Sequence, residues 1–286
     1  MTCRFKEKLQ KGSVQSDCEV SFSEVIVSAS REAKMKVAGV DGCKDGWFAV
    51  ATVDGKFTDA HFFRSFSDLV EILSGASIIG VDIPIGLLED SFRQADAEAK
   101  KFLERRASSI FLTPPRRVLE AANYEKANRL ARRLGKGISK QAYSLRKKIF
   151  EVEEHAATNT RIIEVHPEVS FVEMAGRPLT SSKKTWDGIL ERLTLLRKAG
   201  LDLAKKLPKT GTRVAPDDVV DAAAVAWTAA RVAQGQALTD PTSSSYRALE
   251  KPPHCHLALI LGSCELRRSL AGLELLLQSC YRCADL

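Results

Sequence analysis

The chain has 286 residues, of which 44% are hydrophobic and 28% are charged, and its net charge is +7. These values are typical of a globular protein with one large core, alone or with an inserted module. No apolar run approaches the roughly 20 residues of a membrane-spanning helix, and the odd count of 7 cysteines does not fit a disulfide framework. No membrane partner is therefore expected, and the expected location is a reducing compartment, the cytoplasm.

Residues 1–34 have mixed charge and many serines but lack the continuous apolar run of a secretory signal. They are predicted to form a disordered or appended N-terminal extension. The main domain is predicted over residues 35–249.

Three strands in a meander are predicted over residues 37–63, with turns at 42–46 and at Asp54-Gly55. A short helix over 67–73, capped by Ser67, leads to a fourth strand over 78–83. The first and fourth strands are β-branched runs that stop at Asp41 and Asp82. The predicted order is therefore β-β-β-α-β, with both aspartates at one edge of the sheet.

A basic helical insertion is predicted over residues 91–157, between the fourth and fifth strands. Within it, residues 93–148 hold 16 Lys or Arg and 5 Asp or Glu, a local charge of +11 that leaves −4 for the rest of the chain. Such a segment either follows a nucleic-acid backbone or forms the solvated face of an ordinary enzyme. The predicted phosphate-binding residues are Arg105, Arg106, Arg116, Lys136, Ser139, Lys140 and Gln141.

The fifth strand is predicted over residues 161–166. Glu164 and His166 alternate with apolar residues, so both are expected on one face of this strand. His166 is a candidate general base or water-orienting group, and Glu164 is a second-tier candidate metal ligand. The alternative is a strand-end turn whose polar groups are satisfied within the protein.

Helices are predicted over residues 186–207 and 216–234. Asp218 and Asp221 lie one turn apart on one face of the last helix. Asp217 is a second-tier site candidate and the predicted N-cap. The Ala222-Ala-Ala run that follows predicts close packing of this helix on the sheet.

Residues 250–286 are predicted to be a divergent tail, rich in cysteine, with an apolar helix over 257–277. It holds 4 of the 7 cysteines, among them Cys280-x-x-Cys283. This pair has no second pair at the spacing of a zinc site.

Four carboxylates, those of Asp41, Asp82, Asp218 and Asp221, are predicted to bind a metal. Crowded carboxylates repel one another unless a cation neutralises them, and Mg²⁺ or Mn²⁺ suits such a set of oxygen ligands. For Asp41 the alternative is a turn closed by its own backbone. A dinucleotide fold is not indicated, because the glycines after Asp41 lack its spacing.

Five motifs in order resemble the domain of unknown function 429 family of predicted RNase H-like nucleases, over roughly residues 35–249. They are Val-Asp41-Gly-Cys-Lys-Asp-Gly-Trp, Gly-Val-Asp82-Ile-Pro-Ile-Gly, Gly-Lys-Gly-Ile-Ser139-Lys-Gln141, Glu164-Val-His-Pro-Glu168 and Asp217-Asp-Val-Val-Asp221-Ala. The last looks like the metal-binding helix of Holliday-junction resolvases. The resemblance implies an α/β fold with a ribonuclease H-like mixed sheet flanked by helices, and a metal at these four aspartates.

The function hypothesis is Mg²⁺- or Mn²⁺-dependent hydrolysis of phosphodiester bonds in DNA or RNA. In a two-metal carboxylate mechanism, Asp41 bridges both ions, Asp82 completes one site, and Asp218 with Asp221 completes the other. A catalytically silent nucleic-acid-binding module and ATP-dependent phosphotransfer to a small molecule remain as alternatives. The oligomeric state stays open between a monomer and a homodimer.

Overall fold

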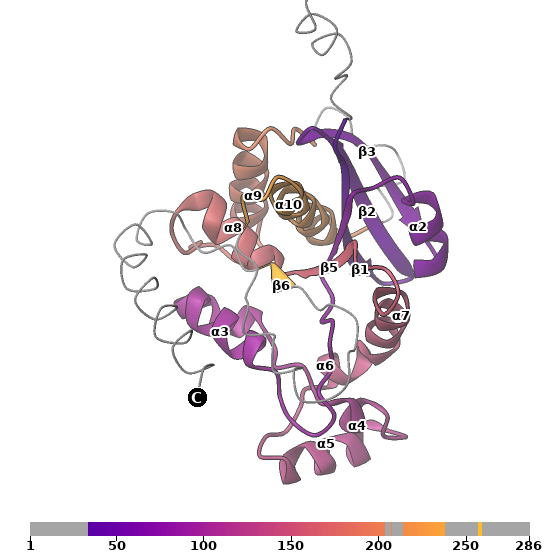
Figure 1. Ribbon diagram of the computed structural model, residues 1–286. Helices are drawn as coiled ribbons and strands as arrows, with labels where there is room; N and C mark the ends of the chain where they lie inside the picture. Colours follow the sequence, from indigo (N-terminus) through magenta and orange to yellow (C-terminus); the bar gives the residue numbers. More distant parts are fainter. Residues whose placement is uncertain (1–33, 204–206, 208–213, 238–256, 259–286) are drawn as a thin grey trace, which may run out of the picture. The chain divides into compact units, whose positions relative to one another are not determined.

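A computed structural model of the chain describes residues 34–203, 207, 214–237 and 257–258. Met35 begins the compact unit described below. Its centre is one mixed sheet with the strand order β3-β2-β1-β4-β5-β6 (Figure 1). The strands are β1 (Lys36–Cys43), β2 (Gly46–Val53), β3 (Lys56–Phe63), β4 (Ile78–Val81), β5 (Ile162–Val165) and β6 (Leu257–Ala258).

The first three strands form the predicted antiparallel meander, and β4, β5 and β6 then continue the sheet parallel to β1. The β2–β3 turn is made by Asp54 and Gly55, whose φ angles are 50° and 73°. Positive φ at both central residues is the geometry that matches the twist of a hairpin, and Asp-Gly tolerates it. This hairpin is confirmed as predicted.

Helices flank the sheet and fill the interval between β4 and β5. The helix α2 joins β3 to β4, five α-helices and one 3₁₀ helix (η1) lie in the insertion, and three helices follow β5 within the described part of the chain. Their bounds are α2 (Phe66–Ile72), α3 (Gln94–Leu103), η1 (Glu104–Ser109), α4 (Arg116–Leu119), α5 (Tyr124–Arg133), α6 (Lys140–Ser144), α7 (Arg146–Ala156), α8 (Pro167–Ala175), α9 (Trp186–Lys198) and α10 (Pro216–Ala233).

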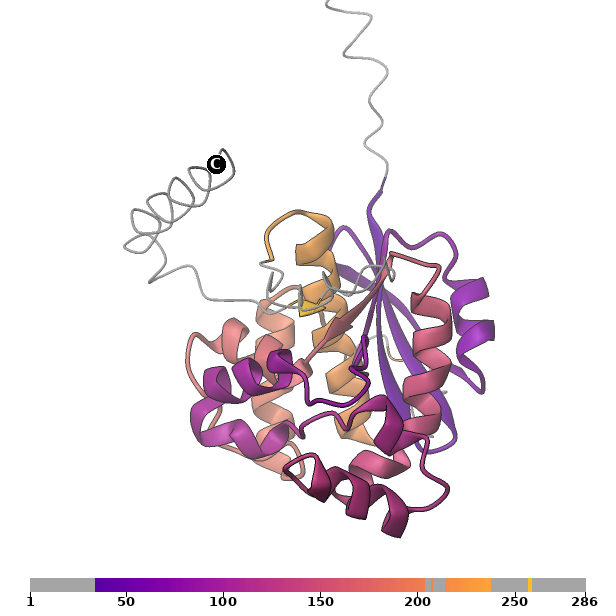
Figure 2. The ribbon, with the colours of Figure 1, turned by 60° about the horizontal axis from the view of Figure 1, so that its bottom comes forward.

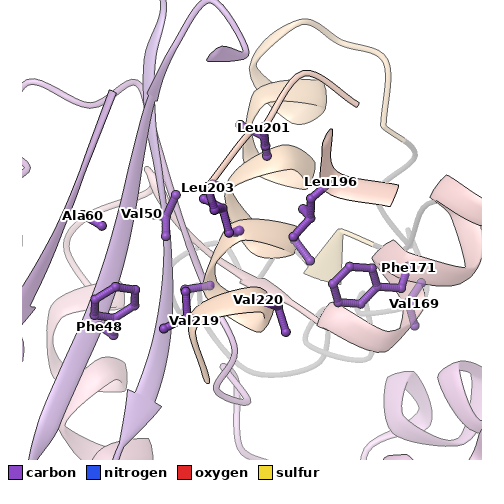
Figure 3. Close-up of a cluster of buried hydrophobic side chains, with 14 of the residues drawn as sticks. Phe48, Val50, Ala60, Val169, Phe171, Leu196, Leu201, Leu203, Val219 and Val220 are labelled. Atoms are coloured by element: carbon purple, nitrogen blue, oxygen red, sulfur yellow. The ribbon is translucent and has the colours of Figure 1, made fainter. Parts of the chain in front are cut away.

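The sheet buries apolar side chains on both faces. On one face, Phe48 and Val50 of β2 pack with residues of α8, α9 and α10 (Figure 3). On the other face, Trp47 of β2 packs with α2 and α7. Neighbouring residues of one strand thus serve opposite cores, as the alternation of side chains along a strand requires.

The insertion forms a small core of its own beside the ends of the strands. Val118, Ala127, Ala131, Ile138 and Tyr143 are its buried residues, and Figure 2 shows the helices α4 and α5 of this core below the strands. The first and last helices of the insertion, α3 and α7, instead pack in the cores on opposite faces of the sheet. The predicted helical insertion between the fourth and fifth strands is therefore confirmed. Among the described residues, no helix is long and apolar enough to cross a membrane.

Close contact between α10 and β1 sets the position of the helix on the sheet. A methyl group on Gly39 of β1 would lie 2.0 Å from the backbone nitrogen of Ala226 and 2.3 Å from the carbonyl oxygen of Ala222. The helix backbone therefore rests directly on the strand, and only glycine fits there. Ala222, Ala223 and Ala224 are buried, which confirms the close packing predicted for this run.

Several predicted boundaries are wrong. The fourth and fifth strands end at Val81 and Val165, and α9 ends at Lys198 rather than at residue 207. The cap of α2 is Ser65, whose hydroxyl accepts a hydrogen bond from the Asp68 amide, and not Ser67. A capping side chain selects its helix by local backbone geometry, which two nearby serines do not distinguish in sequence.

The tail does not begin with a helix at residue 257. Leu257 and Ala258 form β6 and pair with Glu164 and Val165 of β5. The remainder of the predicted helix over 257–277, the Cys280-x-x-Cys283 pair and residues 1–33 of the predicted extension lie outside the described residues.

Substitution of Gly39 by alanine tests the contact between α10 and β1. Because the new methyl group meets helix backbone that cannot rotate away, the free energy of unfolding is expected to fall by about 3 kcal/mol or more. Denaturant unfolding followed by circular dichroism measures this change. The matched control is Gly75→Ala, where the added methyl group meets nothing within 4 Å; equal stability of the two variants would contradict the assigned contact.

Candidate metal centre

Two of the predicted ligands lie side by side because β1 and β4 are parallel neighbours. Val40 pairs with Val81, and the Asp82 amide donates to the Val40 carbonyl over 2.9 Å. Asp41 and Asp82 are the next residues along the chain, so they lie side by side at the same end of the sheet. The first strand was predicted to stop at Asp41, but β1 continues to Cys43.

The third ligand comes from α10. Asp221 directly precedes Ala222, which rests on Gly39, so the helix contact brings its side chain to Asp41. One carboxylate oxygen from each of Asp41, Asp82 and Asp221 lies within 4.8 Å of the others. The structure thus brings together three of the four aspartates predicted from the sequence.

Burial makes this cluster electrostatically costly. Burial, with repulsion from Asp82 and Asp221, raises the pKa of Asp41 well above its usual range. Burial and the charge of Asp221 raise the pKa of Asp82 to about 8, and burial also raises the pKa of Asp221. A positive charge at this point would lower the cost of ionising the three carboxyls together.

Asp218 lies beside the cluster and is half-buried. Burial and the neighbouring charges of Asp217 and Asp221 raise its pKa to about 6. The three-carboxylate group with oxygens within 4.8 Å does not include Asp218, but its charge contributes to the raised pKa of Asp41. Its role as a ligand therefore stays a prediction.

Asp217 does not cap the last helix. The N-cap of α10 is Ala215, with Pro216 in the first turn, and the Asp217 carboxylate accepts a hydrogen bond from Lys184. Asp217 is buried, so its charge is balanced by a side chain from the α8–α9 connection rather than by the helix amides.

Lys183, from the same connection, reaches the centre itself. Its ammonium group donates to Asp221 Oδ2, and its side chain is 36% exposed while that of Asp221 is 1% exposed. Burial opposes the charge of Lys183, but Asp221 and Asp82 outweigh it and raise the pKa of this lysine above its usual range. Lys183 is thus a cationic side chain in direct contact with the acidic cluster.

A cavity of about 360 Å³ opens over the centre. The predicted site residues on its wall are Asp41, Asp82, Arg106, Gln141, Glu164, His166, Asp217 and Asp218. His166 faces this cavity with its Nδ1 atom buried and unpaired within the described structure. Burial and the nearby Lys183 charge lower the pKa of His166 to about 4, so the imidazole is neutral at pH 7 and can accept a hydrogen bond.

Glu164 takes part in an ion pair. Arg93 donates to both of its oxygens over 2.7 and 2.6 Å, and the Ile85 amide donates to Oε2 over 2.9 Å. Arg93 also binds Asp96, and Asp96 accepts from the Thr113 amide over 2.6 Å. Both oxygens of Glu164 have partners, and the network fastens the insertion to β5.

A second buried ion pair joins α8 to α9. Arg192, fully buried, donates to both oxygens of Glu168 over 2.9 and 2.8 Å. Arg106 of the insertion adds a third hydrogen bond to Glu168, over 3.1 Å. These bonds lower the pKa of Glu168 although burial opposes them, so the carboxylate stays ionised and holds three segments at the cavity wall.

Most of the predicted phosphate-binding residues lie away from the cavity. Arg116 binds Glu153 over 2.6 Å, Ser139 caps α6, and Lys140 lies over the ring of Tyr124. Arg105 and Lys136 are exposed. Only Arg106 and Gln141 of the predicted set line the cavity, and the roles of the others stay predictions.

Sequence reasoning missed three residues that organise the centre, namely Lys183, Arg93 and Arg192. Each pairs with a carboxylate distant in the chain: Lys183 with Asp221, 38 residues away, and Arg93 with Glu164, 71 residues away. No spacing rule links such partners. The adjacent lysines at 183 and 184 were a visible charge signal, but nothing local showed that they face the acidic cluster.

The donor set fits a hard divalent cation. All three converging ligands are carboxylates, which Mg²⁺ and Mn²⁺ prefer. Asp221 Oδ1 is buried without a hydrogen-bond partner in the described structure, and a buried charged oxygen of this kind needs a cation or a donor. The residues present therefore suit the metal predicted from the sequence.

The strand order and the helices on both faces define an α/β fold with a mixed sheet, as the ribonuclease H-like resemblance implies. The chain belongs to the family described as "Protein of unknown function (DUF429)", whose model matches residues 39–245. It is also similar to a Thermus thermophilus RuvC structure, with 14% identity, a TM-score of 0.31, and coverage of 71% of this chain and 98% of that chain. No curated protein matches the sequence.

Replacing Asp82 by asparagine is expected to stabilise the metal-free protein. A carboxyl whose pKa is raised on folding loses stability as pH rises from its unfolded pKa, about 4, to its folded one, here about 8. The neutral amide removes that loss. In EDTA, Asp82→Asn should raise the free energy of unfolding by on the order of 1–3 kcal/mol at about pH 9 and much less at about pH 5.

Denaturant unfolding at the two pH values measures this difference. Asp187→Asn, at an exposed position in the first turn of α9, serves as the matched control and should change stability little at either pH. A loss of stability in Asp82→Asn at the higher pH would show that the Asp82 charge is compensated in the metal-free state.

Proposed function

We propose that the protein is a metal-dependent nuclease that hydrolyses phosphodiester bonds in nucleic acid. The observation that carries the proposal is the convergence of Asp41, Asp82 and Asp221, with oxygens within 4.8 Å of one another. Asp41 and Asp82 line an open cavity, and Asp221 lies buried next to them. The five sequence motifs that resemble predicted RNase H-like nucleases, together with the mixed sheet that this resemblance implies, also support it.

Asp41, Asp82 and Asp221 would hold the metal, and Asp218 is the candidate fourth ligand. When bound, Mg²⁺ or Mn²⁺ activates a water and stabilises the negative charge that develops on the leaving oxygen. Asp41 lies on β1, Asp82 directly follows β4, and Asp221 lies on a helix packed directly on β1. Ligands on such rigid elements are held in place before substrate arrives.

Cationic and polar side chains on the cavity wall suit a phosphate. Lys183 and Arg106 both line it, and Gln141 adds amide donors. Positive charge near a scissile phosphate stabilises the charge that accumulates on its oxygens. His166 is neutral at pH 7 and lines the same cavity, which suits it to orient the attacking water by accepting a hydrogen bond from it. Its low pKa makes it a weak general base at pH 7.

The basic insertion would hold the rest of the nucleic-acid backbone. Its helix α5 carries Lys126, Arg129, Arg132 and Arg133 on exposed positions. Contacts of this kind release counterions and give affinity without sequence information, so binding should weaken steeply as salt is raised. DNA and RNA both satisfy this part of the proposal.

The nuclease proposal is tested by incubating the purified chain with labelled single-stranded, duplex and branched DNA and with RNA. Each substrate is tested with Mn²⁺, Mg²⁺ or EDTA. Asp41→Asn should lower the cleavage rate by roughly a hundred- to ten-thousand-fold, because a bound metal contributes several kcal/mol to transition-state stabilisation. Asp187→Asn should cleave as the wild type does.

Cleavage retained in Asp41→Asn would remove this aspartate from the catalytic centre. Absence of cleavage on every substrate with either metal would overturn the nuclease proposal and favour a silent binding module. The hypothesis of small-molecule phosphotransfer remains untested and would gain support from saturable ATP binding in calorimetry.

Lys183 and a metal ion are expected to compete for Asp221, because the lysine ammonium occupies one of its oxygens. Lys183→Gln removes a positive charge next to the metal ligands. It should tighten Mn²⁺ binding by about 1–2 kcal/mol, roughly 5- to 30-fold in Kd, while slowing cleavage. Lys184→Gln, which alters the neighbouring pair with Asp217, is the matched control and should change Kd less.

Calorimetric titration of the folded variants with Mn²⁺ measures this effect without any substrate. Weaker binding in Lys183→Gln would mean that the lysine positions Asp221 for the metal instead of competing with it.

A further inference from the structure

One large aromatic side chain lies exposed close to the candidate centre. Trp186, the first residue of α9, is 76% exposed, the highest value among the large hydrophobic residues that the structure describes. Trp47 is buried and Trp227 is half-buried. Tryptophan exposes much apolar area in such a position, which is typical of a binding surface.

A rigid turn presents Trp186. The hydroxyl of Thr185, the N-cap residue, accepts from the Gly188 amide over 3.2 Å and donates to the Ser182 carbonyl over 2.8 Å. A methyl group on Gly188 would lie 1.9 Å from that carbonyl. Buried Arg192 also donates to the Ser181 carbonyl, over 3.2 Å. The backbone of residues 181–185 is therefore held by hydrogen bonds to the Thr185 hydroxyl and to the Arg192 guanidinium.

The same turn carries the two lysines that reach the acidic side chains. Lys183 binds Asp221, and Lys184 binds Asp217. Three residues of extended chain span at most about 11 Å, so the Trp186 backbone lies within that distance of Lys183. Lys183 and Lys184 line the cavity, and the exposed Trp186 follows them on the same turn. An aromatic ring and ammonium groups on one turn form a combination that complements a nucleotide, with its base and its phosphate.

We propose that Trp186 stacks on an unpaired base next to the phosphate held at the acidic centre, so that the substrate class is nucleic acid with single-stranded character at that point. This inference rests on the proposed function. Bases inside a duplex present their faces to one another, whereas an unpaired base can stack on a side chain. Single strands, bulges and branch points therefore fit the surface, and continuous duplex does not.

The test measures binding of labelled single-stranded and duplex oligonucleotides to full-length Asp41→Asn protein in EDTA, so that cleavage cannot interfere. Adding Trp186→Ala should weaken single-strand binding by about 5- to 150-fold, the range for loss of one stacked base, and leave duplex binding nearly unchanged. Trp186→Phe, which keeps an aromatic face, should restore most of the affinity.

Ile72→Ala is the matched control. Ile72 is 67% exposed on α2, and its removal should not change binding to either oligonucleotide. Tryptophan fluorescence gives a second readout, because stacking should quench Trp186. The quenching by single strands should be lost in Trp186→Phe, in which Trp47 and Trp227 remain.

Three results would overturn the stacking proposal. They are unchanged single-strand affinity in Trp186→Ala, an equal loss on single strands and duplex, and a variant that changes only the self-association of the chain. If the wild type cleaves nucleic acid while Trp186→Ala behaves normally, the nuclease proposal stands and the stacking proposal fails. If nothing is cleaved but stacking is observed, the nuclease proposal fails and the stacking of Trp186 on a base stands.

Discussion

Direct contact of a helix backbone with a strand backbone is the constraint on which the candidate centre depends. The missing side chain at Gly39 and the small side chains at Ala222 and Ala226 let α10 rest on β1. This contact sets the height of Asp221 above the strand that carries Asp41. Because α8 and α9 pack on α10 in turn, it also fixes the connection that delivers Lys183. If a larger side chain held α10 farther from β1, the carboxylates of Asp41 and Asp221 would move apart.

The clustered negative charge of the centre lowers the folding stability of the protein. The carboxyls of Asp41 and Asp221 are buried, that of Asp82 is partly buried, and their raised pKa values mean that ionising them opposes folding. Natural proteins tolerate such a cost mainly at functional sites. Lys183 offsets part of it from a connection between helices. The buried pairs Arg93–Glu164 and Arg192–Glu168 hold the surrounding segments. In the pair Lys183–Asp221, by contrast, one oxygen of Asp221 has no hydrogen-bond partner among the described residues.

The sequence predicted those parts of the fold that local patterns determine. Alternating strands, the Asp-Gly turn and the alanine run of α10 each follow from the chemistry of a few consecutive residues, and they place Asp41, Asp82 and Asp221 correctly at one end of the sheet. The ion-pair partners of Glu164 and Asp217 could not be predicted from the sequence, because Arg93 and Lys184 are far away in the chain. The sequence does not show whether a carboxylate is neutralised by a metal ion or by an arginine side chain.

The outer edge of the sheet is completed by a segment beyond the residues that match the family. Leu257 and Ala258 pair with β5, whereas the match ends at residue 245. A recombinant fragment cut at the family boundary would therefore leave the amide and carbonyl groups of Glu164 and Val165 open to another chain. Unprotected strands of this kind promote aggregation, so poor solubility of such a fragment would reflect a lost neighbour strand rather than a defect of the domain itself.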